Sequence, residues 1–316
     1  MVCHECSSVA KKHGKDRYGQ QRYRCKACGK SFIQADHKPL GDMRLEMDQA
    51  VMALKLLLEG MSIRATERFT GIHRDTLCDL VATVGKNCKT FLRSKVRDVE
   101  AHDVECDEIW GFVGCKEKTR QLLGHAENKG DAYCFVAIER ETKLVLNWHL
   151  GKRCTEDTVE FLEDLRYATT GRYQLSTDGY RPYSLCVPHI YNGNVDFAQL
   201  VKKFGKSEDK NGARRYSPAT IIGIDKVNGC GKPDMSMVCT SHIERLNLSI
   251  RMGNRRMTRL TNAHSKKWAN HEAMLALYFA WYNFCRKHTT LKQTPAQANN
   301  LTDHQWTIEE LLKAAA

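Results

Sequence analysis

Three acidic residues stand out because each lies in or beside an apolar segment. They are Asp107 in "VECDEIWGFVG", Asp178 at the end of "YQLSTDG" and Glu244 in "TSHIERLNLSIRM". Carboxylates that converge repel one another unless a cation lies between them, and hard oxygen ligands select Mg²⁺ or Mn²⁺. Two such ions stabilise the attacking and leaving oxygens of a phosphoryl transfer. The pattern therefore indicates metal-dependent phosphodiester chemistry, although acids at strand ends are also common without it.

The surroundings of these acids leave alternatives open. Alternation along a strand places Glu105 and Asp107 on one face and Glu108 on the other, so only one side is expected to meet Asp178. Alternation alone does not say which side. Ser241, three residues before Glu244, fits a helix capping box, which is a purely structural role for that acid.

Four cysteines near the start of the chain form two pairs. "CHEC" contains Cys3 and Cys6, "CKAC" contains Cys25 and Cys28, and 18 residues lie between the pairs. Two intervening residues let each pair direct both thiolates at one tetrahedral centre, and the spacing between the pairs is typical of zinc sites. The sequence predicts a zinc ribbon with one structural Zn²⁺, because four protein ligands leave no open position.

The composition is that of a globular protein with a polyanionic partner. Of 316 residues, 42% are apolar and 27% charged, which suits two or three soluble domains, and the net charge is +12. That charge predicts binding to nucleic acid or to an anionic membrane surface. Residues 1–40 hold nine Lys/Arg against three acids, and residues 251–267 hold six and none. Two separate basic stretches favour a long ligand, although either alone could be a solvated surface.

Neither a secretion signal nor a membrane span is expected. Charged residues and cysteines occupy the first thirty positions, where a signal would need an apolar run. The longest uncharged apolar run, 273–284, is shorter than the ~20 residues of a span. The 14 cysteines therefore indicate a reducing compartment with a metal site rather than a disulfide framework. We expect a cytoplasmic protein without a membrane partner.

Residues 44–97 have the pattern of a helix-turn-helix. A first helix ends at Gly60, Ser62 can cap a second helix over residues 63–70, and a tight turn at Gly71 precedes a third. The outward residues at the start of the third helix would face the DNA major groove: Arg74, Asp75 and Cys78. The alternative is a helical bundle that only separates two domains. Glu67 counts against DNA binding, because the position four before the turn glycine is usually small.

Strand patterns follow from about residue 100. "VECDEIWGFVG", "DAYCFVAIER" and "KLVLNWHL" read as strands, "TEDTVEFLEDLRYA" as an amphipathic helix and "YQLSTDG" as a further strand. This order predicts a mixed sheet with a crossover, in which Asp107 and Asp178 occupy strand positions typical of sites. A helix at 270–288 is expected to cover the sheet.

The chain resembles a transposase of the insertion-sequence-one family, specifically its longer members. The resemblance covers nearly the whole chain and rests on the ribbon, the helix-turn-helix, "DEIWGFVG", "TDGYRPY", "IERLNLSIR" and "RRMTRLTNAHSKK". It implies an α/β fold: an N-terminal zinc ribbon and helix-turn-helix, followed by a ribonuclease-H-like mixed sheet flanked by helices. The expected domains are a ribbon at 1–40, a helix-turn-helix at 41–98, a catalytic domain at 99–290 with an elaboration near 190–236, and a tail at 291–316.

The resemblance also implies an activity. Asp107, Asp178 and Glu244 would form a DDE triad, with Asp107 bridging two Mg²⁺ or Mn²⁺ ions and the other acids holding one each. The chain would cleave transposon ends at their inverted repeats and join the freed 3′ hydroxyls to target DNA. The expected DNA contacts are Arg22, Arg24, Lys30, Arg74, Asp75, Asn247, Arg251, Arg255, Arg256, Arg259, Lys266 and Lys267. A homodimer or larger assembly acting on a prokaryotic nucleoid is implied, because two DNA ends must be held together.

Two other functions fit the same residues. One is a DNA-binding regulator whose catalytic domain is inactive. The other is a metal-dependent nuclease of the same fold, such as a resolvase, which would cut DNA without joining it.

Overall fold

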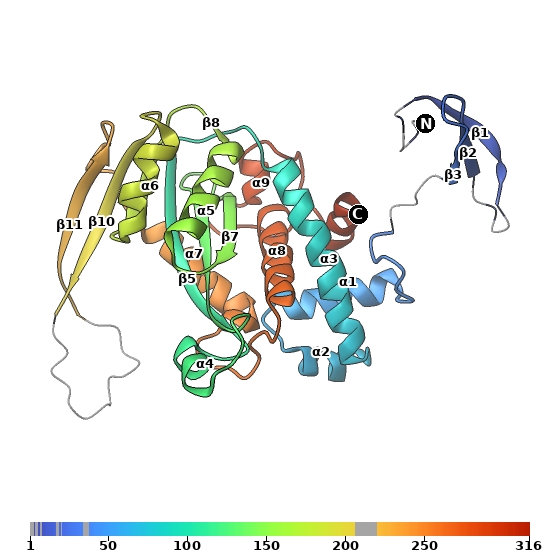
Figure 1. The fold of residues 1–316 in the computed structure, drawn as a ribbon, viewed down its shortest axis with the longest axis horizontal. Helices are drawn as coiled ribbons and strands as arrows, with labels where there is room; N and C mark the ends of the chain where they lie inside the picture. The colour runs from blue at the N-terminus through green and yellow to red at the C-terminus, as the bar shows by residue number, and fades with distance from the viewer. Residues whose placement is uncertain are drawn as a thin grey trace. The chain divides into compact units, whose positions relative to one another are not determined.

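The structure is a computed structural model, and its elements are shown in Figure 1. It describes residues 3, 6, 8–16, 19, 21–33, 38–205 and 220–316. The chain divides into two compact units, Met1–Pro39 and Leu40–Ala316, which are treated separately below.

The first unit contains a small antiparallel sheet. Its strands are β1 (Ala10–Lys15), β2 (Gln21–Cys25) and β3 (Ser31–Ile33), with β2 in the middle. The segment "QRYRC" forms β2. Gly29, directly after the second cysteine pair, has a φ of 70°, a conformation that glycine adopts without steric cost. The sheet and this turn bring the two cysteine pairs together.

Three helices open the second unit and match the predicted helix-turn-helix. They are α1 (Met47–Leu58), α2 (Ile63–Thr70) and α3 (Arg74–Lys95). The Ser62 hydroxyl accepts a hydrogen bond from the Ala65 amide at 3.2 Å, and Gly71 takes the left-handed conformation after α2. Glu67, too large for the usual pattern, has its own role: its Oε1 accepts from the Arg74 amide at 2.9 Å and so caps α3.

These helices share a core with the end of the chain. At Gly85 of α3 an added Cβ would lie 2.2 Å from the carbonyl oxygen of Ala273 in α8 (Trp268–Phe284), so the two backbones touch. The final helix, α10 (Ile308–Ala315), buries Ile308, Leu311 and Leu312 against this core. Residues 41–98 and 291–316 were predicted as separate regions, but both pack within the second unit.

A six-stranded mixed sheet occupies the second unit beside these helices (Figure 1). In spatial order its strands are β11 (Ile221–Cys230), β10 (Asp196–Phe204), β9 (Gln174–Asp178), β5 (Asp103–Val113), β6 (Gly130–Glu139) and β7 (Val145–Gly151). Strands β5, β6 and β7 are antiparallel, β9 runs parallel to both β5 and β10, and β11 is antiparallel to β10. The predicted mixed sheet with a crossover is confirmed.

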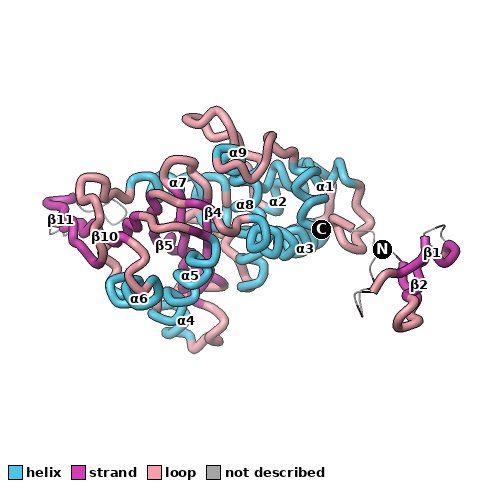
Figure 2. The backbone as a smooth tube through the Cα atoms, turned by 90° about the horizontal axis from the view of Figure 1, so that it is seen from above, coloured by secondary structure: helices cyan, strands magenta, loops and turns pink. Residues whose placement is uncertain are grey.

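Helices cover both faces of this sheet. The crossover helix α5 (Thr155–Ala168) joins β7 to the β9 side, and α6 (Arg181–Tyr191) joins β9 to β10. Figure 2 shows these two helices on one side of the strands and α7 (Ser241–Gly253) on the other. Helix α8 packs Phe279 on Trp148 of β7, and the Asn283 side chain exchanges hydrogen bonds with the Val145 backbone at 3.0 and 2.9 Å. The expectation that this helix covers the sheet holds at the β7 edge.

Shorter elements complete the unit. They are β4 (Val99–Glu100), α4 (Glu117–Leu123), β8 (Thr169–Thr170), the 3₁₀ turn η1 (Arg255–Met257) and α9 (Pro295–Ala298). In the elaboration predicted near 190–236, strands β10 and β11 extend the sheet, and residues 206–219 lie outside the described residues. Among the described helices, none combines the length and apolar character needed to cross a membrane.

The close contact at Gly85 predicts a sensitive position. Gly85→Ala places a methyl group against the Ala273 carbonyl, and we expect a loss of about 1–3 kcal/mol in the free energy of unfolding, as for other overpacked sites. Gly223→Ala is the matched control, because its Cβ meets only ordinary contacts. Urea denaturation of both variants measures the difference. Equal stability of the two would contradict the close packing of α3 on α8.

Candidate metal centres and nucleic-acid interface

Two of the three predicted acids come together at the centre of the sheet. Cys106 of β5 lies opposite Thr177 of the parallel strand β9, so the next residues, Asp107 and Asp178, are also neighbours. Carboxylate oxygens of Asp107, Glu108 and Asp178 all lie within 4.8 Å of one another. The expectation that only one side of β5 meets Asp178 is therefore wrong. Asp178 ends its strand, where side chains from both faces of β5 can reach it.

Glu105 anchors a helix to the sheet. Its side chain is fully buried, and its Oε2 accepts hydrogen bonds of 2.9 Å from the amides of His242 and Ile243, in the first turn of α7. The first amides of a helix have no partner within the helix and attract negative charge. A carboxylate from β5 thus satisfies two of them and fixes α7 against the strand.

This contact corrects the predicted capping box. Ser241 is the first residue of α7, and Thr240 before it is the N-cap position. The Thr240 hydroxyl donates to Glu244 Oε1 at 2.7 Å, while the helix amides bond to Glu105. The capping acid therefore comes from β5, which sequence spacing alone could not indicate.

One turn along α7, Asn247 contacts the carboxylate cluster directly. Its Nδ2 donates to Asp107 Oδ2 at 2.7 Å, and the Glu108 amide donates to Asp107 Oδ1 at 2.8 Å. Asn247 was predicted as a DNA contact, and in this structure its side chain bonds to Asp107. Its position orients the Asp107 carboxylate, as groups behind metal ligands commonly do.

Glu244 lies near this cluster without belonging to it. Its carboxylate contacts the ammonium group of Lys202 on β10 and the hydroxyl of Thr240, and about half of its side chain is exposed. Glu244 nevertheless lies close enough that its charge helps to raise the pKa of Asp107. The structure therefore brings Asp107 and Asp178 together and leaves Glu244 paired with Lys202 beside them.

Arg153, which the sequence analysis missed, also faces the acids. Its Nε lies 3.3 Å from Glu108 Oε2, its Nη2 lies 3.8 Å from Asp178 Oδ2, and its guanidinium stacks over the Tyr180 ring at 4.2 Å. Arg153 lies in the loop between β7 and α5, far in sequence from the other residues. The sequence around Arg153, "GKRCTED", has no pattern that distinguishes this arginine from other basic loop residues.

Two of these carboxyl groups, those of Asp107 and Glu108, hold protons more tightly than usual. Burial raises the pKa of Asp107 to about 7, and the negative charge of Asp178 adds to this effect. Burial, followed by the same charge, raises the pKa of Glu108 to about 8. One Glu108 oxygen is buried without a hydrogen-bond partner in the described structure. An all-oxygen donor set fits Mg²⁺ or Mn²⁺.

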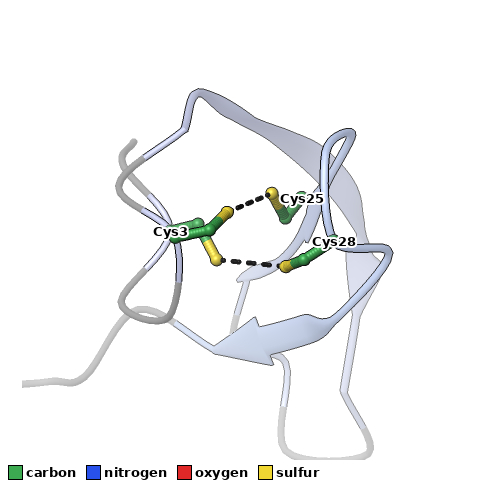
Figure 3. A group of neighbouring side chains, drawn as sticks. Cys3, Cys25 and Cys28 are labelled. Carbon is green, nitrogen blue, oxygen red and sulfur yellow. Dashed lines mark hydrogen bonds between the residues drawn. The ribbon is translucent and has the colours of Figure 1, made fainter.

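The cysteines of the first unit form a second possible metal centre. Cys3 Sγ lies 3.6 Å from Cys28 Sγ, and Cys6 Sγ lies 3.4 Å from Cys25 Sγ. Figure 3 shows Cys3, Cys25 and Cys28 converging, and all four sulfurs lie within 4.8 Å of one another. Sulfurs bound to Zn²⁺ at about 2.3 Å in a tetrahedron are about 3.8 Å apart, so the arrangement fits zinc.

A third group of possible ligands consists of His149, Asp157 and Glu160. His149 Nε2 lies 2.7 Å from Asp157 Oδ1, and the other Asp157 oxygen accepts from the Lys152 amide at 2.8 Å. These bonds tie the start of α5 to β7. The group therefore has a structural explanation and was not predicted.

The predicted DNA-contacting cations divide into two sets. Arg251 donates to the carbonyls of Trp110 and Met257, and Arg256 donates to the Asn270 carbonyl at 2.5 Å. Burial lowers the pKa of both guanidinium groups, that of Arg251 to about 10. These two arginines hold the segment after α7 in place. The others are exposed: Arg22, Arg24, Lys30, Arg74, Arg255, Arg259, Lys266 and Lys267, together with Asp75.

Comparison with known proteins finds distant structural similarity. No protein-family model matches the chain, and no curated protein matches it. The chain is similar to a solved structure described as a piggyBac transposase synaptic complex with hairpin DNA. That similarity has 11% sequence identity and a TM-score of 0.41, and covers 86% of this chain and 70% of the other. Similarity at this level does not establish a shared fold or function.

The raised pKa values predict a pH-dependent stability. Without divalent metal, the folded state holds the Asp107 and Glu108 protons more tightly than the unfolded chain does. The resulting stabilisation is complete below about pH 4 and is lost as the pH rises through about 7 to 8. We expect the Tm of Asp107→Asn, relative to the unsubstituted protein, to rise across this range, because the amide does not ionise.

Thermal unfolding of the zinc-loaded protein in the absence of Mg²⁺ measures this difference. At each pH the Tm of the variant is compared with that of the unsubstituted protein. The contributions of other titrating groups, such as Glu105 and His271, then cancel. Mg²⁺ should raise the Tm more at pH 8 than at pH 6, because fewer protons must leave. Glu309→Gln, which removes a half-buried acid that pairs with Lys313 on α10, should not alter the pH profile. If Asp107→Asn and Glu309→Gln have the same profile, the acids do not titrate as described.

Proposed function

We propose that this chain is a DDE-type DNA transposase with a ribonuclease-H-like catalytic domain, resembling the insertion-sequence-one family. It binds the terminal inverted repeats of a transposon, cleaves the ends and joins the 3′ hydroxyls to target DNA. The observation that carries the proposal is the meeting of Asp107 and Asp178 on adjacent parallel strands, beside a helix that carries Glu244 and Asn247. The net charge of +12 on the chain favours a nucleic-acid substrate.

In this proposal the triad holds two Mg²⁺ or Mn²⁺ ions. When bound, such ions neutralise the charge that develops on the attacking and leaving oxygens of the phosphodiester. Asp107 and Asp178 supply ligand oxygens, and Asn247 holds the Asp107 carboxylate in one orientation. Glu244, which pairs with Lys202 in this structure, would supply the third carboxylate to the metal site, and Lys202 would then be free to contact substrate phosphate.

Glu108 and Arg153 have supporting roles. The Arg153 guanidinium lies close to both Glu108 and Asp178 and offsets negative charge at the site. Because the Glu108 side chain is buried, its pKa is raised to about 8, and its carboxyl can retain a proton. Both residues keep the acids close together before substrate arrives.

The remaining parts of the chain serve DNA binding and assembly. The four cysteines hold one structural Zn²⁺, and the exposed Arg22, Arg24 and Lys30 of the ribbon contact phosphate. A homodimer or larger assembly holds two DNA ends together. The chemistry requires access to chromosomal DNA, which in a prokaryote lies in the cytoplasm.

An oligonucleotide assay tests this function. The substrates are the inverted repeats that flank the gene and a target duplex, with Mg²⁺ present. We expect joined products, and we expect Asp107→Asn, Asp178→Asn and Glu244→Gln each to reduce them by about 100-fold or more, the loss typical of removing a group that stabilises developing charge. Glu309→Gln on α10 should retain full activity.

Two results would support the alternatives. Cleavage without joining would identify a nuclease, such as a resolvase, with the same acids. Binding to the repeats with neither cleavage nor joining would identify a regulator with an inactive catalytic domain. Either result contradicts the proposed transposase.

A further inference from the structure

A large groove lies in the second unit, away from the carboxylates. Its volume is ≈ 1350 Å³. One wall is formed by the loop between α1 and α2 and by the start of α3, including Arg74 and Asp75. The other wall is formed by residues 254–266, and the lining also includes Phe112 of β5 and Lys116, which directly precedes α4. The groove therefore joins the helix-turn-helix to the basic segment that follows α7.

Exposed cations occur on both walls of this groove. They are Arg64, Arg74, Lys116, Arg255, Arg259 and Lys266, while Asp75 is the one carboxylate among the lining residues. Across the part of the chain that the structure describes, no ion pair involves any of these six cations. Cations without acidic partners that line a concave surface attract and hold a polyanion.

The two walls are fixed to one another. At Gly60 in the first wall, an added Cβ would lie 2.4 Å from the carbonyl oxygen of Met252, just before the second wall. Gly85 touches the Ala273 backbone in the same way, and Arg256 ties the basic segment to Asn270 of α8. The helix-turn-helix thus cannot move independently of residues 254–266 while this packing persists.

The size and lining of the groove indicate a nucleic-acid duplex. Small-molecule sites usually have volumes of about 300–1,000 Å³ and are mainly apolar. Proteins that hold single strands present open aromatic faces for base stacking. The aromatic ring in this lining, Phe112, already packs on Trp110 and His264, at 5.7 and 4.6 Å between ring centroids. Cations on two walls suit phosphates of a double helix.

We propose that the start of α3 and residues 254–266 form one binding surface for a single DNA duplex. This inference rests on the proposed function, because it assumes that the chain acts on DNA. The sequence predicted DNA contacts in both segments and did not place them on one surface. Arg74 on one wall and Arg259 on the other contact the same duplex, and binding there does not require the carboxylates.

Salt-dependent binding of the full-length, zinc-loaded protein tests the proposal. The probe is a labelled 30-base-pair duplex without added divalent metal, measured by fluorescence anisotropy, with stoichiometry from sedimentation. Each phosphate contact contributes about 0.9 to the slope of log K against log salt concentration. Arg74→Gln and Arg259→Gln should each reduce the slope by about 0.9, and the double variant by about 1.8. The ratio of protein to duplex should stay unchanged.

The controls separate this inference from the function on which it rests. Lys313→Gln, an exposed cation on α10, should keep the full slope, and thermal unfolding should show that all variants fold. If either wall's substitution leaves the slope unchanged, or if each one removes a separate bound duplex, the single-surface proposal is wrong. Tighter binding of a single strand than of the duplex would also overturn it. If the unsubstituted protein binds no DNA at all, the proposed function itself fails.

Discussion

The hydrogen bonds from the first turn of α7 to Glu105 determine how the candidate catalytic site is built. A buried carboxylate is costly unless its oxygens are bonded, and unpaired helix amides are also costly. Oε2 of Glu105 and the two helix amides satisfy one another, at 2.9 Å for both bonds, while Oε1 of Glu105 is buried without a partner in the described structure. Because α7 is fixed at this point on β5, one further turn brings Asn247 onto Asp107. The same anchoring sets the start of the basic segment, which leaves α7 near the helix-turn-helix.

Charge balance explains the surroundings of the carboxylates. Asp107, Glu108 and Asp178 are too close together to be ionised at the same time without a cation. In this structure Arg153 and Lys202 provide positive charge at the two sides of the site, and raised pKa values keep protons on Asp107 and Glu108 near neutral pH. Divalent ions would take over this role. An acidic cluster of this kind is stable within a basic chain because its charge is neutralised locally.

The sequence predicted features that depend on local pattern. Local sequence was enough to predict the cysteine cluster, the Ser62 cap, the turn at Gly71 and the mixed sheet. The structure contains all four features. Contacts between distant segments could not be predicted in this way. Arg153 reaches the acids from a loop, Glu105 caps a helix more than a hundred residues away, and Gly85 joins α3 to α8. Arg251 and Arg256 are a further example. Their basic sequence context suggests DNA contacts, whereas in the structure they donate hydrogen bonds to distant backbone carbonyls.

The position of Mn²⁺ in crystals of the protein, located by its anomalous scattering, tests the central claim most directly. The claim is that Asp107 and Asp178 hold a divalent ion beside α7. We expect an anomalous peak between these two carboxylates, with Glu244 turned from Lys202 toward the ion and Asn247 still bonded to Asp107. Mn²⁺ bound only at His149, Asp157 and Glu160, with Arg153 and Lys202 still paired to their acids, would contradict it.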